Sequence, residues 1–189
     1  MSNIYLKNYF YIFCLSIFLV FARPAFAADP SEHLTMGNLT NAAQDINQPN
    51  NYLLSKTQFV MSYNRDNAIP NWVLWHLNLS WLGSAPRQDN FRSDTDLPTG
   101  WYRVVSSDYT NSGFNRGHLT PSADRTSSIE DNSATFLMTN MFPQAPDNNQ
   151  GPWEKLEDYC RVPVNQGNVS CMSLRAAQAL GEREATERL

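Results

Sequence analysis

Within residues 71–79 every second position from Val73 to Leu79 is apolar, with the polar His76 and Asn78 between the later ones, and this period of two is the clearest structural signal in the chain. A period of two is typical of a β-strand whose two faces meet different surroundings. Residues 58–64 form a second run, rich in β-branched and aromatic side chains, and the polar residues 64–67 favour a turn after it. We predict a β-hairpin from these two runs. One face of its second strand would carry Trp72, Leu74, His76 and Asn78, and the other Val73, Trp75, Leu77 and Leu79.

The middle of the chain contains weaker signals. Residues 84–99 form a long polar segment, and long ordered loops often carry function. Residues 101–105 fit one more short strand. Gly113, Gly117 and Pro121 disfavour regular structure around the segment 115–125, so we predict that this segment lies in a loop. The apolar run 133–139 fits either a buried strand or part of a helix, because runs of this length do not distinguish the two.

A helix is predicted to begin at Asn148 or Asn149, because an asparagine side chain can cap it and Pro152 suits its first turn. Glu157 and Arg161 would lie one turn apart on one face. A different, buried face would carry the apolar residues that recur at helical spacing, which are Trp153, Leu156 and Cys160.

Residues 1–27 have the features of a secretory signal peptide. Lys7 precedes an almost unbroken apolar run from Tyr9 to Phe21, and Ala25-Phe26-Ala27 fits the small-residue cleavage rule. The apolar run is shorter than the roughly 20 residues that a membrane-spanning helix needs. We therefore expect cleavage between Ala27 and Ala28, a secreted or periplasmic protein, and no stable membrane association afterwards. The following residues, 28–50, are polar and predict a segment with little regular structure.

The length of 189 residues fits one domain behind this leader. The formal net charge of −4 argues against a general nucleic-acid coat protein, since such proteins are usually basic. It is compatible with an enzyme that binds one phosphate through a few local arginines. Cys160 and Cys171 remain after removal of the leader and could form a disulfide in an oxidising compartment.

The candidate chemistry centres on residues 115–125, which contain a histidine, two arginines and an aspartate. His118 can accept a proton from water near neutral pH. Asn149 offers an amide oxygen to Mg²⁺, and Glu157 could hold the water molecules of that ion. Guanidinium groups contact phosphate through paired hydrogen bonds, and the candidates for this role are Arg87, Arg116 and Arg161.

Each of these residues also has an ordinary structural interpretation. A single histidine in a loop is more often structural than catalytic. Asn148 and Asn149 before a helix could simply be caps. Glu157 and Arg161 could form a surface ion pair worth about 0.2–0.5 kcal/mol. The arginines and aspartates of residues 87–94 could be a solvated charge cluster. Spacing alone therefore leaves nuclease as one option among several.

Longer motifs favour the nuclease. Residues 115–118 together with 121–125 resemble the D-R-G-H motif of the DNA/RNA non-specific endonucleases, the family of secreted bacterial nucleases and mitochondrial endonuclease G. Residues 140–144 and 149–157 resemble the second motif block of that family, in order and at its spacing. Residues 87–92 resemble the upstream arginine segment of its cyanobacterial-type members. The resemblance runs from about His33 to Arg161.

This resemblance implies an α+β fold, with a ββα-metal core on a mixed, mainly antiparallel sheet and flanking helices. It implies an endonuclease domain over residues 51–167 and a cofactor that is Mg²⁺ or Mn²⁺. The expected substrates are DNA and RNA, cut to products with a 5′-phosphate. The resemblance implies that His118 is the general base, that Asn149 is the direct metal ligand, and that Glu157 holds metal-bound water. It implies that Arg87 stabilises the charged transition state with assistance from Arg116 and Arg161. Asn140 would support the site from behind.

The chain departs from the family pattern in two places. Asn115 stands where the family has aspartate; an amide keeps the size and the hydrogen-bonding oxygen but loses the charge, so we expect weaker positioning of the metal or the arginines. Residues 168–189 form an atypical tail, where the family continues with strand-rich sequence. Few β-branched residues follow Val169, and the Ala, Glu and Arg content favours helix. We expect a truncated or shifted reading frame from about Asn168 and a fold incomplete at its C-terminus.

The sequence thus predicts a secreted, Mg²⁺-dependent endonuclease. The alternative is a catalytically impaired fragment of such a nuclease, which at most binds nucleic acid. An extracellular interaction module would require the central motif to be coincidental, and a serine hydrolase is disfavoured because the chain contains no G-x-S-x-G sequence.

Overall fold

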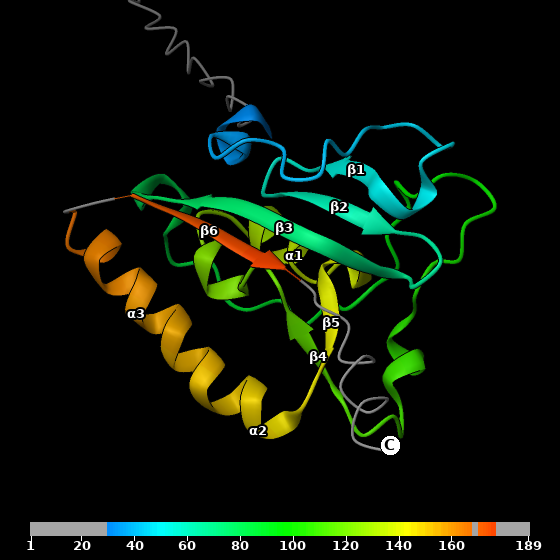
Figure 1. Cartoon of the computed structure of the whole chain (residues 1–189). Coiled ribbons are helices and arrows are strands. Elements are labelled where there is room, and N and C mark those ends of the chain that lie inside the picture. The colour runs from blue at the N-terminus through cyan, green and yellow to red at the C-terminus, as the bar shows by residue number, and fades with distance from the viewer. Residues whose placement is uncertain (1–29, 168–169, 177–189) are drawn as a thin grey trace, which may run out of the picture.

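The computed structural model describes residues 30–167 and 170–176, and the expected signal peptide lies outside these ranges. It contains a four-stranded antiparallel sheet and a separate two-stranded hairpin (Figure 1). The order in the larger sheet is β1-β2-β3-β6, with bounds Tyr52–Ser55, Val60–Asn64, Ile69–Leu77 and Cys171–Ala176. The hairpin pairs β4, Asn115–His118, with β5, Met141–Gln144. The α+β fold class is therefore confirmed.

The helices are short except for one. They are α1, Ile129–Ala134, α2, Pro146–Asn148, and α3, Glu154–Asn165, with a π-helical turn, Asn149–Trp153, between the last two. In Figure 1, α3 and the β4–β5 hairpin lie against one face of the larger sheet, while the N-terminal segment crosses the other face. Within the ranges that the structure describes, no helix is long and apolar enough to cross a membrane.

The predicted hairpin is confirmed as β2 and β3, which pair antiparallel around the turn after Asn64. The alternation along β3 divides its side chains between two cores, since successive residues of a strand point to opposite faces. Val73, Trp75 and Leu77 pack toward α3 and the small hairpin, whereas Trp72 and Leu74 pack toward the N-terminal segment. Leu79 is an exception: it leaves the strand and is about half exposed. Strand β1 was not predicted.

Two predictions for the middle of the chain are wrong. Residues 101–105 are not a strand; their backbone is held by side chains instead, since Ser93 Oγ donates to the Val104 carbonyl and Arg103 donates to the Asp94 carbonyl. The predicted loop 115–125 contains β4, because β5 supplies a pairing partner 20 or more residues later in the chain. The ambiguous run 133–139 contributes the end of α1 and the start of a 3-10 turn, Met138–Asn140.

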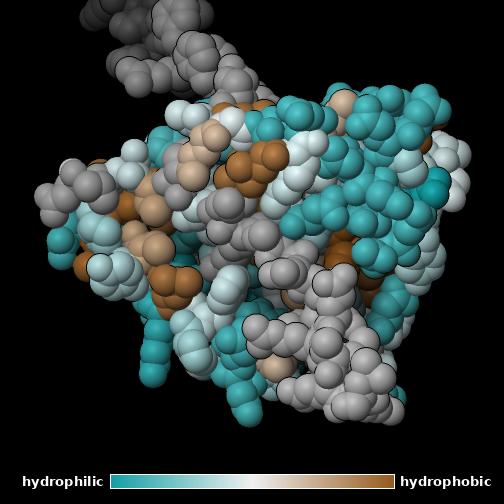
Figure 2. Space-filling model, in the orientation of Figure 1, coloured by the Kyte–Doolittle hydropathy of each residue, from teal (hydrophilic) through white to brown (hydrophobic). Residues whose placement is uncertain are grey.

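The predicted helix exists, and Trp153 and Cys160 of its predicted buried stripe are partly buried, but Leu156 is not. Leu156 was expected to be buried and is 51% exposed. The inward face carries Val164, which is fully buried, together with the partly buried Glu157 and Arg161. Leu156, Tyr159 and Val162 are exposed, and hydrophobic patches lie over α3 (Figure 2).

The strand β6 contradicts the helical expectation for the residues after Val169. It pairs antiparallel with β3 from Leu77↔Cys171 to Trp72↔Ala176. The free edge of β3 supplies a full set of backbone hydrogen bonds, and such tertiary pairing commonly overrides local propensity. Residues 177–189 lie outside the described ranges. Cys160 on α3 and Cys171 on β6 are both partly buried, and their pairing stays a prediction.

A buried histidine connects the N-terminal segment to the sheet. His33 is fully buried, its Nε2 lies 2.9 Å from the Thr57 carbonyl, and its Nδ1 accepts from the His76 amide. This pattern fits the neutral ring, which donates through Nε2 and accepts through Nδ1. Burial lowers the pKa of His33 to about 4.

We expect this histidine to make folding weaker in acid. The unfolded chain protonates His33 near its ordinary pKa of 6.5 whereas the folded chain does so near 4, so the free energy of unfolding should fall by about 3 kcal/mol as pH drops from about 7 to about 4. Urea unfolding at several pH values, compared with His33→Gln, which can donate and accept in the same places, isolates this contribution. Parallel pH profiles for the two proteins would contradict it.

Candidate active site

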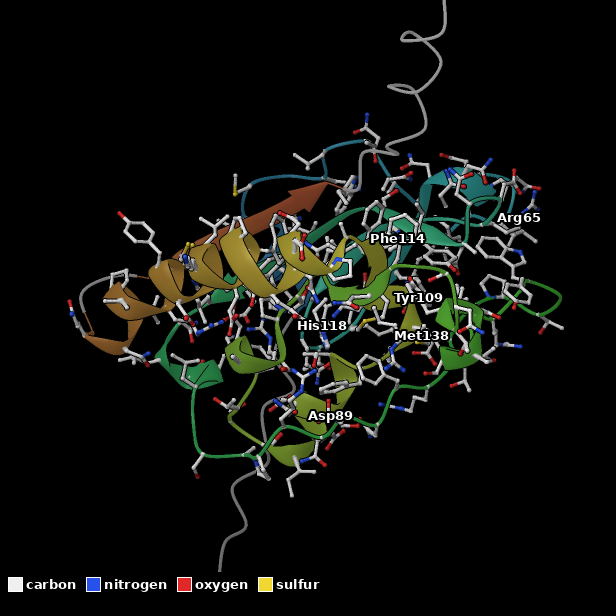
Figure 3. The ribbon with its side chains drawn as sticks, turned by 90° about the horizontal axis from the view of Figure 1, so that it is seen from below. Arg65, Asp89, Tyr109, Phe114, His118 and Met138 are labelled. Carbon is white, nitrogen blue, oxygen red and sulfur yellow. The ribbon has the colours of Figure 1, made fainter. Side chains whose placement is uncertain are left out.

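A polar cleft of about 460 Å³ lies beside the β4–β5 hairpin and the turn before α3. Four of the predicted site residues line it: Arg87, Asn115, Arg116 and Asn149. Residues from the long polar loop, the small hairpin and the helical turn therefore meet at one place, although more than 60 residues separate Arg87 from Asn149 along the chain. The cleft also contains Asp89, Phe91, Tyr109 and Phe114, and Figure 3 labels three of these around His118.

Strand β4 places Arg116 and His118 two residues apart, hence on the same face. Gly117 lies between them and packs against Gln144 of β5; a Cβ atom there would lie 2.2 Å from Gln144 Oε1 and 2.8 Å from its Cβ. Only glycine allows this close approach of the two strands without displacing Gln144. Packing against Gln144 thus explains why the motif has glycine at position 117.

Aromatic rings hold the basic groups in position. Phe91 and Phe136 contact each other edge to face at 5.0 Å, and the His118 ring lies 4.8 Å from Phe136 and 5.8 Å from Phe91. Arg87 stacks over Phe136 at 4.8 Å, and Arg116 stacks over Phe91 at 4.0 Å. Both contacts fall within the range of cation–π attraction. Each of the two rings therefore contacts the imidazole and one guanidinium.

The two cleft arginines keep part of their hydrogen-bonding capacity. Arg87 donates to Ser122 Oγ at 2.8 Å and to the carboxylate of Asp89 at 2.7 Å, and its side chain is 52% exposed. Arg116 donates to Ser106 Oγ. Each guanidinium has five N–H donors, so donors remain for an anion in the cleft.

Asn149 lies in an irregular part of the helical segment before α3. Gly151 has φ −127° and ψ −105°, which breaks the helical path, and Pro152 follows it. The helical structure begins earlier than predicted, at Pro146, with Ala145 as the residue before it. The capping interpretation of Asn148 is wrong, since its side chain makes no cap hydrogen bond, and Asn149 lies inside the π-helical turn.

Arg161 connects α3 to the central motif. Its Nη1 donates to Asp124 Oδ1 at 2.8 Å, and its Nη2 donates to Asp158. Asp124 is 2% exposed and its other oxygen accepts from Trp75 Nε1 at 2.8 Å. Burial acts to lower the pKa of Arg161, but the hydrogen bonds and charges of Asp124 and Asp158 outweigh it and raise the pKa above its ordinary value.

Glu157 lies one turn before Arg161 on the inward side of α3 and is partly buried. Its charge contributes to the raised pKa of Arg161, so the two side chains lie near each other. The alternative of a surface pair does not fit, because the Arg161 side chain is only 13% exposed. Of the predicted site residues, His118, Asn140, Glu157 and Arg161 do not line the 460 Å³ cleft.

Asn140 is fully buried behind the hairpin. Its amide donates to the carbonyls of Thr120 and Thr135, both at 2.9 Å, and its Oδ1 accepts from the Thr120 amide at 2.9 Å. Its own carbonyl accepts from the Leu119 amide. Asn140 therefore fixes the backbone that follows His118 directly.

The other arginine of the central motif is structural. Arg125 is fully buried, stacks over Trp81 at 4.2 Å, and donates to the carbonyls of Gln58, Asp124 and His76. Burial lowers the pKa of Arg125 to about 10. It joins the motif to the sheet rather than to the cleft.

Sequence reasoning missed several contributors to this site. Phe91 lies inside the quoted arginine segment and Phe136 inside the apolar run 133–139, so both were visible only as packing residues. Ser106, Ser122 and Asp124 carry no local pattern that reveals their arginine partners. Asp89 was visible as a neighbour of Arg87, and it does pair with it.

The hairpin that bears the histidine, together with the helix that follows it, defines a ββα-metal nuclease fold. One solved structure with this similarity is a chain of the crystal structure of the EndoG/EndoGI complex, with a TM-score of 0.60 and 25% identity over 71% of this chain and 53% of that chain.

The chain belongs to the DNA/RNA non-specific endonuclease family, which it matches over residues 37–174. It is 58% identical to a nuclease of Nostoc sp. (strain PCC 7120 / SAG 25.82 / UTEX 2576) over 137 residues, which are 72% of this chain and 50% of that protein. It is 40% identical to the mitochondrial nuclease EXOG of Danio rerio over 56% of this chain and 31% of that protein. The chain thus spans half the length of the first relative and about a third of the second. The family match continues to residue 174, within β6.

Proposed function

We propose that this protein is an endonuclease that hydrolyses phosphodiester bonds of DNA and RNA. The observation that carries the proposal is the cleft in which Arg87, Arg116 and the Asn149 amide meet, with His118 held beside it on the same face of β4 as Arg116. Family membership supports the same reaction class.

Arg87 and Arg116 would bind the non-bridging oxygens of the phosphate through their remaining donors and stabilise the charge that grows there during attack. His118 would accept the proton of the attacking water, since an imidazole can change its charge near neutral pH. The contacts of its ring with Phe91 and Phe136 orient it for that transfer. Arg161 is held by Asp124 and would assist from the side of α3.

The donor groups fit a hydrated magnesium or manganese ion. Asn149 offers one hard oxygen in the cleft, and within residues 30–167 and 170–176 no three His, Cys, Asp or Glu side chains gather to form a full protein cage. A divalent ion that keeps most of its water needs few protein ligands. When bound, such an ion would neutralise phosphate charge and lower the pKa of water. Asn149 would hold it, and we propose that Glu157 binds its water molecules from α3.

The cleft groups recognise phosphate rather than base edges. Contacts to the backbone carry no sequence information, so we propose that DNA and RNA are both substrates, cut to 5′-phosphate products.

We also propose that the protein acts outside the cytoplasm after cleavage at Ala27/Ala28. A mass measurement of the exported protein tests this, and an intact Met1 would oppose it.

Wild-type protein is expected to cut a supercoiled plasmid and a structured RNA in Mg²⁺, to lose this activity in excess chelator, and to regain it when Mg²⁺ or Mn²⁺ is added back. Gel electrophoresis with end-group analysis of the products measures all three outcomes.

A preparation of His118→Asn purified in parallel controls for host nucleases. Equal cutting by the two proteins, or cutting that is indifferent to chelator, would reject the proposal. Binding of oligonucleotides without any cutting would instead identify the impaired nucleic-acid-binding form.

A further inference from the structure

A second, mostly apolar pocket of about 330 Å³ opens next to the arginine cleft. Its apolar walls come from the start of β3, the segment after the long polar loop, the residue before β4, and β5. They are Ile69, Tyr102, Val104, Tyr109, Phe114 and Pro143. The roles assigned above to the cleft residues do not involve this pocket.

The two pockets share a wall. Tyr109 and Phe114 line both of them, and Figure 3 shows these two side chains next to each other on the side of the molecule where His118 lies. Phe114 immediately precedes β4 and lies two residues before Arg116, a spacing of about 7 Å along an extended chain. A group bound at Arg116 and a group stacked on Phe114 are thus within one nucleotide of each other.

The ring of Phe114 is available to a ligand. It is 46% exposed, and the preceding loop presents it at the surface: Asn111 and Gly113 have positive φ, and Ser112 Oγ accepts from the Phe114 amide. Tyr102, on the same pocket, is 60% exposed. Burial raises the pKa of Tyr109 to about 12, so this wall stays neutral at the pH of the reaction.

We propose that this pocket is a nucleobase subsite, in which Phe114 stacks on the base of the nucleotide next to the phosphate bound by the arginine cleft. This inference rests on the proposed function and extends it. The pocket surface is mostly apolar, although Asn67, Asp108 and Ser112 also line it, and the Asp108 carboxylate already accepts from the Tyr102 hydroxyl and the Val105 amide. The apolar surface accepts any of the bases by its flat face, as expected for a protein that does not select sequence.

A base can enter this pocket only when it is unpaired. Bases inside a duplex are stacked on their neighbours and face inward, whereas single strands, loops and frayed ends can present a base to an aromatic side chain. The preferred ligand is therefore a single-stranded stretch of DNA or RNA, and a duplex binds through its phosphates alone.

Binding of fluorescent oligonucleotides to the full chain, measured by anisotropy in chelator so that no cutting occurs, tests the subsite. One probe is oligothymidylate of about ten nucleotides, within the range of usual single-strand sites, and the other is an abasic sugar–phosphate oligomer of the same length. Phe114→Ala should raise the Kd for oligothymidylate about tenfold and leave the Kd for the abasic oligomer unchanged.

The matched control is Tyr159→Ala, which removes another exposed ring, on the outer side of α3 and away from both pockets; it should change neither Kd. Phe114→Trp keeps a flat ring and should bind oligothymidylate as tightly as wild type, with a change in its tryptophan emission that the abasic oligomer does not cause. The proposal is overturned if Phe114→Ala weakens both probes equally or weakens neither, or if the emission of Phe114→Trp responds to both probes alike.

Arg116→Gln separates this proposal from the one on which it rests. It should weaken the binding of both probes, because it removes a phosphate contact. Unchanged binding of both probes by Arg116→Gln would be a failure of the phosphate cleft, whereas a missing difference between base-bearing and abasic probes would be a failure of the base subsite.

Discussion

Replacing His118 with asparagine is expected to lower kcat on plasmid DNA by about 10²–10⁴-fold, the usual contribution of a positioned general base. Asparagine keeps a planar polar group but cannot accept a proton from water near neutral pH. Initial rates at saturating DNA and fixed Mg²⁺, with the wild type measured beside it, give this ratio.

The thermal unfolding midpoint is the companion measurement, because the His118 ring packs against Phe91 and Phe136. A variant that melts like wild type and still loses most of its rate assigns the effect to chemistry. Retention of more than about a tenth of the wild-type rate would show that another group takes the proton, since even the low end of general-base contributions is about 10²-fold.

Asp124→Ala is expected to lower the free energy of unfolding by about 3–5 kcal/mol, the cost of removing one partner of a buried ion pair. The Asp124 side chain is 3% exposed and the Arg161 side chain 13% exposed, so the guanidinium would lose its main partner in a place that water hardly reaches. Trp75 Nε1 would lose its acceptor in the same variant. Urea unfolding at neutral pH measures the change.

Asp158→Ala is the matched control, because Asp158 binds the same guanidinium but is 65% exposed. Exposed ion pairs are typically worth about 0–1 kcal/mol, so this variant should unfold close to wild type. Equal destabilisation by both variants would mean that Arg161 is not anchored through the central motif.

The sequence was sufficient for those parts of the fold in which a local pattern and burial agree. The alternation along β3 was informative because both faces of that strand are buried in different cores. It failed for β4 and β6, because a strand of few residues owes its structure to a partner that local sequence does not reveal. The buried face of α3 was predicted only in part: Trp153 and Cys160 are partly buried, but Glu157 and Arg161 also turn inward and Leu156 is exposed.

The sequence motifs predicted which residues line the cleft but not the contacts that hold them in place. The family resemblance singled out Arg87, Arg116 and Asn149, and the structure brings these three together. The contacts that hold them come from phenylalanines, serines and an aspartate spread over the chain, and no spacing rule connects those residues. The kink at Gly151, two residues after Asn149, was equally invisible in a segment that could be taken for a capped helix.

The rings of Phe91 and Phe136 affect how the site should respond to high salt concentration. Neither ring carries a charge that dissolved ions can mask, so the guanidinium groups resting on them should keep their places when the ionic strength rises. Attraction between those guanidinium groups and a polyanion does weaken under the same conditions. Concentrated salt should therefore lower the affinity for nucleic acid, while the side chains around a bound strand keep their arrangement.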